Sequence, residues 1–313
     1  MDTGRSVTTA ARAAVGTVVL LLLPGGVTAQ NGSAASGGSA ISWETDFLDE
    51  FEFLDSANWQ DQLLWVNEED QCYVPGGAHN TREVSDGTLK LRVIDLGAVQ
   101  PCSNVHKSGA VHPGSSFVAA RLASKNRREF VGGRWTARLR VKNSGQPGMF
   151  PAWWLLGAQN NEPPVQEDDE YVCWPMTGSG EIDIFEHHGE GGPDRYAARI
   201  IESEGYCGGG DWQASMLVQE APLDQFHEYA VAWIGENLVF TLDGNEVYRL
   251  TGQAALLPEP MFAVLNFAKI KPGPITSPWV MEVDWVKHER IRSPAEAADV
   301  ATPIPALQPG RRP

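Results

Sequence analysis

The sequence contains little of what helical, metal-binding and nucleic-acid-binding proteins need. Long amphipathic helical patterns are missing, no internal repeat with a period of roughly 20 to 50 residues is visible, and no CxxC or clustered Cys/His spacing occurs. Basic residues are also scarce, because 24 Lys and Arg stand against 40 Asp and Glu, for a formal net charge of −16. An acidic chain repels phosphate backbones at long range. These absences argue against a helical repeat protein, a structural zinc site and a nucleic-acid partner.

A long hydrophobic run is present only near the N-terminus. Arg5 and Arg12 precede the apolar run at residues 13–23, and the small residues at 27–29 suit a signal peptidase. The run is shorter than the roughly 20 apolar residues that a membrane-spanning helix needs, and it is broken at Pro24. We therefore predict a secretory signal over residues 1–29, an extracellular location, and no membrane attachment once the signal is removed.

The segments next to the predicted folded region are poor in large apolar groups. Residues 30–40 are rich in Gly, Ser and Ala, which predicts a flexible lead-in. Residues 293–313 have a similarly weak apolar content, which predicts a disordered C-terminal tail. The folded domain is therefore expected over residues 41–292.

Within this region, short segments of alternating apolar residues predict many β-strands. Asp86-Gly87 and Asp243-Gly244 supply turn signals between such segments. Further strands are expected over residues 261–267 and 280–290. The alternating positions are Leu89, Leu91 and Val93; Trp135, Ala137, Leu139 and Val141; Tyr229, Val231 and Trp233; and Leu238, Phe240 and Leu242. This spacing predicts an all-β fold, a single antiparallel β-sandwich of jelly-roll type.

Four cysteines in a chain predicted to be secreted suggest two disulfides, for which three pairings are possible. Sequence alone does not rank these pairings. Because Cys173 and Cys207 flank the segments around the acidic motif at residues 181–186, we favour Cys173–Cys207. By elimination, the second predicted bond is Cys72–Cys102.

The acidic motif GEIDIFE carries three carboxylates, Glu181, Asp183 and Glu186. Side chains on a strand alternate between its two faces, so the first two should share a face and Glu186 should point the opposite way. A β-bulge at Ile184-Phe185 would add one residue and return Glu186 to the shared face. The motif therefore predicts a bulged strand with three acids in a row.

Such a row suits the cleavage of a glycosidic bond. The reaction needs a proton donor for the leaving oxygen and a second carboxylate on the other side of the sugar. Crowded carboxylates push their pKa values apart, so that one stays charged while another keeps its proton. The apolar residues between the acids predict a buried back face, which would leave the acids to line a cleft.

GEIDIFE resembles the ExDxxE signature of glycoside hydrolase family 16, in the bulged form found in laminarinases. Further segments are similar to laminarinases in the same order along the chain, among them LDSANW, NEEDQCY, SDGTLKLRV, FPAWWLLG, LNFA and VDWVKHERI. The resemblance implies a concanavalin A-like jelly roll with an open substrate cleft on its concave face. It also implies a retaining endo-glycosidase that needs no cofactor for catalysis and cleaves neutral β-1,3-glucan or mixed-linkage β-1,3(1,4)-glucan. A monomer is the default expectation for this class.

The resemblance also implies residue roles. Glu181 would be the nucleophile, Glu186 the acid/base, and Asp183 would hold a hydrogen bond or proton that tunes Glu181. His187 and His188, which follow directly, are expected to have a structural role.

Substrate contacts follow from the same resemblance. Trp154 and Trp174 would form a sugar platform, because the apolar faces of sugar rings stack on indoles. Asn67 and Arg121 would hydrogen-bond hydroxyls at the glycone side, with a structural ion pair as the alternative for Arg121. Trp153 should face the opposite way from Trp154, toward the core.

A structural calcium ion is a further implication, held by Glu50 and Asp284 on the convex side. Calcium needs several hard oxygen ligands, so two acids alone are an incomplete set. The ion would act on stability and not on the chemistry.

Two alternatives belong to other functional classes. Non-catalytic β-glucan-recognition proteins share the scaffold but usually lose a catalytic acid, whereas all three acids are present here. A galactan hydrolase of the same family is the second alternative, and the acidic net charge argues against a sulphated substrate.

The chain also departs from many laminarinases, which carry a histidine where Arg199 or Ile200 stands here.

Overall fold

The computed structural model describes residues 41–66, 69–106, 109–160, 180–203, 212–252, 259–270 and 272–292. The predicted signal peptide, lead-in and C-terminal tail lie outside the described residues, so the predicted domain limits stay predictions. Asn67, Trp174, Cys173 and Cys207 also lie outside them. No helix in the described ranges is long and apolar enough to cross a lipid bilayer.

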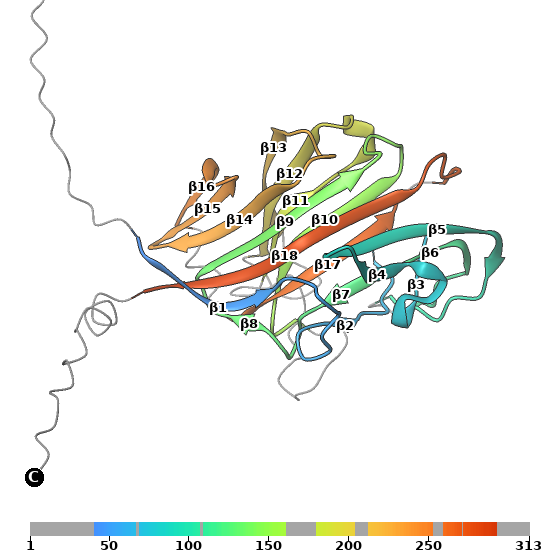
Figure 1. The fold of residues 1–313 in the computed structure, drawn as a ribbon, viewed down its shortest axis with the longest axis horizontal. Helices are drawn as coiled ribbons and strands as arrows, with labels where there is room; N and C mark the ends of the chain where they lie inside the picture. Colours follow the sequence, from blue (N-terminus) through green and yellow to red (C-terminus); the bar gives the residue numbers. More distant parts are fainter. Residues whose placement is uncertain are drawn as a thin grey trace, which may run out of the picture. The chain divides into compact units, whose positions relative to one another are not determined.

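The described residues form two β-sheets that pack face to face (Figure 1). Except for the parallel contact of β3 with β6, the paired strands are antiparallel. One sheet has ten strands in the order β16 (Asn245–Thr251), β15 (Asn237–Leu242), β14 (His227–Ile234), β9 (Arg134–Lys142), β18 (Trp279–Ile291), β5 (Thr88–Gln100), β6 (Ser115–Ala119) and β3 (Cys72–Tyr73), with β1 (Trp43–Asp49) beside β18 and β4 (Arg82–Ser85) beside β5. The other has eight strands in the order β13 (Trp212–Glu220), β12 (Arg195–Ser203), β11 (Gly180–Glu186), β10 (Met149–Gly157), β17 (Met261–Lys269), β7 (Arg121–Ala123) and β2 (Gln60–Asp61), with β8 (Glu129–Phe130) beside β17. Short 3₁₀ turns occur at η1 (Pro75–Asn80) and η2 (Gly189–Gly191). The predicted antiparallel jelly-roll sandwich is confirmed.

One hydrophobic core lies between the two sheets. The alternating positions predicted from the sequence are buried in it, except that Leu242 is only partly buried and packs against it. The facing sheet contributes Trp153 and Leu155 from β10 and Ile182 and Phe185 from β11. Burial of these apolar faces is what holds the two layers together.

Two Asp-Gly turns connect neighbouring strands as predicted. Asp86 and Gly87 join β4 to β5 with φ angles of 52° and 71°, and Asp243 and Gly244 join β15 to β16 with φ angles of 50° and 76°. Positive φ at both central residues matches the right-handed twist of the flanking strands. These turns therefore set the register of two hairpins in the ten-stranded sheet.

The disulfide between Cys72 and Cys102 is present, as predicted. It ties the short strand β3 to the segment that follows β5. The second predicted bond falls on residues outside the described ranges and stays a prediction.

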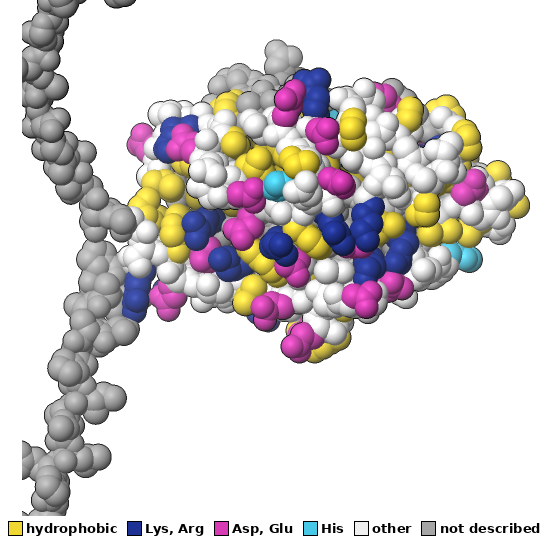
Figure 2. All heavy atoms as spheres, turned by 45° about the horizontal axis from the view of Figure 1, so that its top comes forward, with side chains coloured by type: hydrophobic (Ala, Val, Ile, Leu, Met, Phe, Trp, Pro, Cys, Tyr) yellow, Lys and Arg dark blue, Asp and Glu magenta, His cyan; other side chains and the backbone are white. Residues whose placement is uncertain are grey.

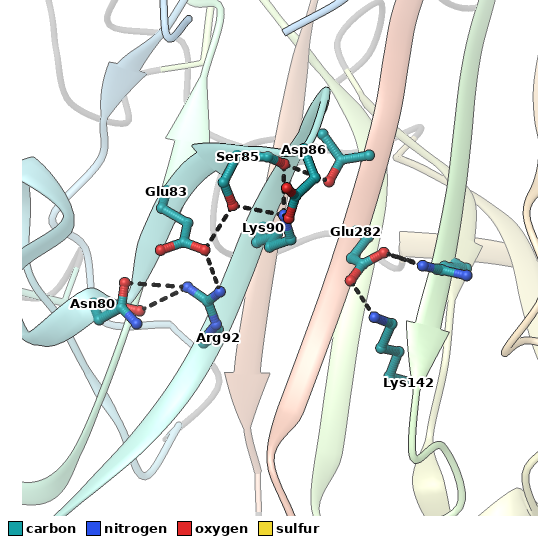
Figure 3. Close-up of polar contacts among 10 residues, drawn as sticks. Asn80, Glu83, Ser85, Asp86, Lys90, Arg92, Lys142 and Glu282 are labelled. Atoms are coloured by element: carbon teal, nitrogen blue, oxygen red, sulfur yellow. Dashed lines mark hydrogen bonds and ion pairs between the residues drawn. The ribbon is translucent and has the colours of Figure 1, made fainter. Parts of the chain in front are cut away.

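Ion pairs cover the outer face of the ten-stranded sheet, opposite the core. In the space-filling view, basic and acidic side chains lie intermixed over one face of the molecule (Figure 2). Figure 3 shows the arrangement on β4, β5, β9 and β18, where Arg92 donates to Glu83 at 2.8 Å and Lys142 lies 2.5 Å from Glu282. On this face the charged groups neutralise one another.

Candidate active site

The predicted β-bulge is present in β11. Against β10, Asp183 pairs with Trp154 while Phe185 pairs with Trp153, so Ile184 is the extra residue. The pairing with β12 shows the same shift between Asp183 and Glu186. One inserted residue therefore changes the phase of the strand between the second and third acids, which confirms the bulge.

As a result, the three acids share one face of the eight-stranded sheet. Their partners on β10 are Leu156 for Glu181, Trp154 for Asp183 and Ala152 for Glu186. These three β10 positions are two residues apart, so their side chains all point to the same face. The acids therefore lie on the face that points away from the core.

The other face of the bulged strand is apolar. Ile182, Ile184 and Phe185 are each at most 2% exposed and belong to the core between the sheets. The adjacent Trp153 lies in the same core, as predicted. Packing of these side chains fixes the bulge, because reversing the phase would bury a carboxylate in the core.

Asp183 and Glu186 are buried carboxyl groups, 2% and 5% exposed, whereas Glu181 is more accessible. Burial raises the pKa of Asp183 well above its usual range, and the charge of Glu181 and a hydrogen bond with it raise the pKa further. Burial, assisted by the charge of Asp183, also raises the pKa of Glu186 to about 8. At neutral pH Glu186 is therefore mostly protonated in the folded protein, and burial favours the protonated form of Asp183.

Arg199 is the cation next to these acids. It pairs with Asp183 across β11 and β12, and its Nη2 lies 3.3 Å from Oε2 of Glu186. Its charge lowers the pKa of both carboxyl groups but does not overcome burial. Sequence reasoning noted this position only as a departure from laminarinases and did not place it at the acids. The alternation in RYAARIIES could have assigned Arg199 to a strand face, but not to a pairing partner.

Trp154 lies beside Asp183 and is held by a chain of hydrogen bonds. Its Nε1 donates to Oδ1 of Asn266 at 2.7 Å, and Nδ2 of Asn266 donates to the Tyr73 hydroxyl at 3.2 Å. The Tyr73 hydroxyl in turn hydrogen-bonds the carboxylate of Glu69. These links run across β10, β17 and β3, so they fix the plane of the indole ring. Only the tertiary structure identifies Tyr73 and Glu69 as supports of Trp154.

Arg121 lies on the same face and supports the same ring. Its guanidinium carbon is 4.9 Å from the centroid of the Trp154 ring, and its Nε donates to Gln62 at 2.6 Å. Only 2% of Arg121 is exposed. The structure thus brings Arg121 and Trp154 together beside the acids, while their contact with a sugar stays a prediction.

Two histidines end the motif and anchor it. His187 is buried, its Nδ1 lies 2.7 Å from the carbonyl oxygen of Arg195, and its Nε2 accepts from the Gly145 amide at 3.3 Å. Burial lowers its pKa, which favours the neutral ring that can donate from one nitrogen and accept at the other. His188 stacks on Phe150 with ring centroids 4.5 Å apart. Both side chains hold the end of β11.

The residues predicted to bind calcium do not by themselves fit the ion. Asp284 forms an ion pair with Arg138. Among the described side chains, no group of three or more His, Cys, Asp and Glu residues could hold a metal ion. An arginine partner competes with a cation for the carboxylate of Asp284, and Glu50 alone is not an oxygen cage. The calcium site stays a prediction, and no catalytic step depends on it.

Comparison with known proteins adds independent findings. The family model described as glycosyl hydrolases family 16 matches residues 76–286, which include the three acids, Trp154 and Arg121. The chain is 27% identical over 195 residues to a beta-glucanase of Rhodothermus marinus, an alignment that covers 62% of this chain and 59% of that protein. The chain therefore spans less than two thirds of the length of this relative.

Two crystal structures are similar to the fold described above. LamAcat from Zobellia galactanivorans has 27% identity and a TM-score of 0.65, and the match covers 78% of this chain and 96% of that one. A variant of LamA from the same organism, in complex with laminaritriose and laminaritetraose, has 26% identity and a TM-score of 0.65. That match covers 79% of this chain and 98% of the other.

Proposed function

The chain belongs to the glycosyl hydrolases of family 16, and from this premise we propose that it is a secreted endo-glycosidase that cleaves β-1,3-glucan or mixed-linkage β-1,3(1,4)-glucan with retention. The names of the relatives support the substrate class, since one is a beta-glucanase and another was crystallised with laminaritriose and laminaritetraose. The observation that carries the proposal is the bulge, because it puts Glu181, Asp183 and Glu186 on one face of β11.

The first step of the proposed reaction breaks the glycosidic bond. Glu186 keeps its proton at neutral pH, because burial raises its pKa to about 8, and donates it to the leaving oxygen. The Glu181 carboxylate attacks the anomeric carbon and forms a glycosyl ester. Because its pKa is also raised, Asp183 keeps a proton that it can donate in a hydrogen bond to Glu181. This bond orients the nucleophile.

The second step releases the sugar. Glu186, now a carboxylate, takes a proton from water while the water oxygen bonds to the anomeric carbon. The ester bond to Glu181 breaks, which returns both carboxyl groups to their starting states. Two displacements on the same carbon give overall retention of the β configuration.

Incubation of the purified protein with laminarin, lichenan, agarose and carrageenan tests the proposal. We expect oligosaccharides from laminarin, with the β anomer formed first in proton NMR spectra. Release from agarose or carrageenan alone would instead support a galactan hydrolase. Polymer binding without new reducing ends would support a recognition protein. An α product would contradict the double displacement.

Glu181→Gln is the matched test of the nucleophile. Turnover should be abolished while the melting temperature changes little, because Glu181 is the most accessible of the three acids. An equally large loss of folded protein would indicate a structural role. The secretory signal is tested separately, by the N-terminal sequence of protein recovered from the culture medium.

A further inference from the structure

The proposed reaction steps assign no role to Arg199. It lies on β12 directly opposite Asp183, and the bulge brings Glu186 to within 3.3 Å of its guanidinium. A quarter of the Arg199 side chain is exposed, against 6% of Glu186. The contact thus joins a buried carboxyl group to a cation at the surface of the site.

The other charged neighbours of Glu186 are acids on its own strand. Asp183 raises the pKa of Glu186, and Glu181 lies next in the row. The strand on the other side, β10, has the sequence MFPAWWLLG and carries no titratable side chain. His187 and His188 follow Glu186 and make the contacts described above. Among the described groups that act on the charge of Glu186, Arg199 supplies the positive one.

When Glu186 is ionised, the negative charge on its Oε2 needs a nearby positive charge. The oxygen is buried and has no hydrogen-bond partner, because the 3.3 Å approach of Arg199 lacks hydrogen-bond alignment. A neutral carboxyl group tolerates such a site, but a buried carboxylate without a partner destabilises the protein strongly. In the second step of the reaction Glu186 must be a carboxylate.

We propose that Arg199 is a positioning residue that stabilises the carboxylate form of Glu186 and thereby enables Glu186 to deprotonate the attacking water. The inference rests on the function proposed above. Loss of Arg199 should slow the hydrolysis of the glycosyl ester more than its formation. It should also move the protonation of Glu186 to higher pH, because an opposite charge within about 4 to 6 Å shifts a pKa by about 1 to 3 units.

The first experiment uses Arg199→Gln and a dinitrophenyl β-laminaribioside, whose leaving group departs without a proton. We expect a burst of about one equivalent of dinitrophenolate, followed by turnover at least about tenfold slower than in the parent protein. Azide should restore the slow phase, because this nucleophile needs no deprotonation. With laminarin, the alkaline limb of kcat/KM should move upward by about 1 unit or more.

Two variants serve as controls. Arg195→Gln removes the same charge from an exposed position on the same strand. It should match the parent protein in the time course of dinitrophenolate release and in the alkaline limb of kcat/KM. Arg199→Lys keeps the charge and should retain most of the parent profile. If Arg199→Gln shows no burst, no response to azide and the parent alkaline limb, the inference is overturned.

An infrared titration separates this inference from the proposed function. The carboxylic-acid band of Glu186, identified by its loss in Glu186→Gln, should persist to higher pH in Arg199→Gln than in the parent. An unchanged band overturns the inference even if the parent protein cleaves laminarin. A parent protein that cleaves no polymer contradicts the proposed function, whereas a shifted band would still support the electrostatic role of Arg199.

Discussion

Two carboxylates on the sheet faces that point away from the core expose similar fractions of their side chains but lie in opposite electrostatic environments. Glu186 on the eight-stranded sheet exposes 6% of its side chain, and Glu282 on the ten-stranded sheet exposes 5%. Burial raises the pKa of Glu282, but hydrogen bonds from Lys142 (Figure 3) and from Arg140 outweigh this effect and lower the pKa. Burial and the charge of Asp183 raise the pKa of Glu186 to about 8 against one misaligned arginine. Glu282 has two cations hydrogen-bonded to it, whereas Glu186 is more strongly desolvated and has Asp183 beside it, so desolvation and neighbouring charges together decide which carboxylate keeps a proton.

The difference separates a stabilising surface from a reactive one. On the ten-stranded sheet, Glu282 receives donors at 2.5 Å from Lys142 and at 2.8 Å from Nε of Arg140, so its charge is satisfied. On the eight-stranded sheet, buried oxygens of Asp183 and Glu186 remain without a hydrogen-bond partner. A site that leaves carboxyl groups unsatisfied loses stability but gains a proton donor at neutral pH.

The largest expected effect is on activity. Glu186→Gln should lower the turnover of laminarin by about 10²- to 10⁴-fold, the range that general acid/base catalysis supplies. Glu282→Gln, the same chemical change on the other sheet, should stay within about twofold because it touches no reacting atom. Initial rates, corrected for the folded fraction by circular dichroism, check both values. Similar losses in the two variants would remove the distinction between the faces.

The second effect is on stability, and the two substitutions should have opposite signs. The folded-state pKa of Glu186 lies above its ordinary value of 4.5, so between about pH 4.5 and 8 the group releases its proton on unfolding and the folded protein loses stability as pH rises. At pH 7, Glu186→Gln should therefore increase the free energy of unfolding, on the order of 2 to 4 kcal/mol.

Glu282 follows the opposite rule, because its folded-state pKa is lowered. Its stabilisation is fully present above its unfolded pKa and is lost as pH falls through the folded value. Glu282→Gln should lower the free energy of unfolding at pH 7 by about 1 to 2 kcal/mol, since both cations are partly exposed. Urea denaturation at pH 7 and near pH 3.5 measures both variants. The two differences should shrink at the lower pH, and equal signs at pH 7 would contradict the comparison.

The smallest expected quantity is a coupling energy, and it concerns the neutral hydrogen bond between Trp154 and Asn266 on the outer face of the eight-stranded sheet. Trp154→Phe should destabilise the protein by about 1 to 3 kcal/mol, because it leaves the buried Asn266 carbonyl unsatisfied. In an Asn266→Leu background the same change should cost less, with a coupling energy of about 1 kcal/mol. Denaturant midpoints of the four proteins in this cycle give the coupling. Additive losses would show that the bond does not hold the ring.

Much of the fold was predictable from local pattern. Alternation at Trp135, Ala137, Leu139 and Val141 identified the core face of β9, and the Asp-Gly pairs identified two hairpin turns. These features depend on period-two geometry and backbone conformation, which neighbouring residues determine. The two-sheet order and the single parallel contact among the described strands depend on pairings between distant segments, which no local pattern specifies.

For the candidate site too, the features set by one strand were predictable and the contacts between distant strands were not. The out-of-phase Glu186 itself indicated the bulge, because three acids on a strand with an apolar back face require a phase change. Arg199 and the supports of Trp154 were not identified as parts of the site. Asn266 is 112 residues from Trp154 along the chain, and its role follows from the register of β10 with β17.

By itself, the sequence determined the strand-forming segments, the row of three acids and the need for a bulge, since each follows from the alternation of side chains along one strand. The tertiary structure alone decided which cations face which carboxylates. It placed Arg140 and Lys142 around Glu282 but, among the described residues, only Arg199 beside Glu186, out of hydrogen-bond alignment. The reason is physical, because protonation depends on burial and on charges from neighbouring strands, and strand register, not proximity in sequence, sets those neighbours.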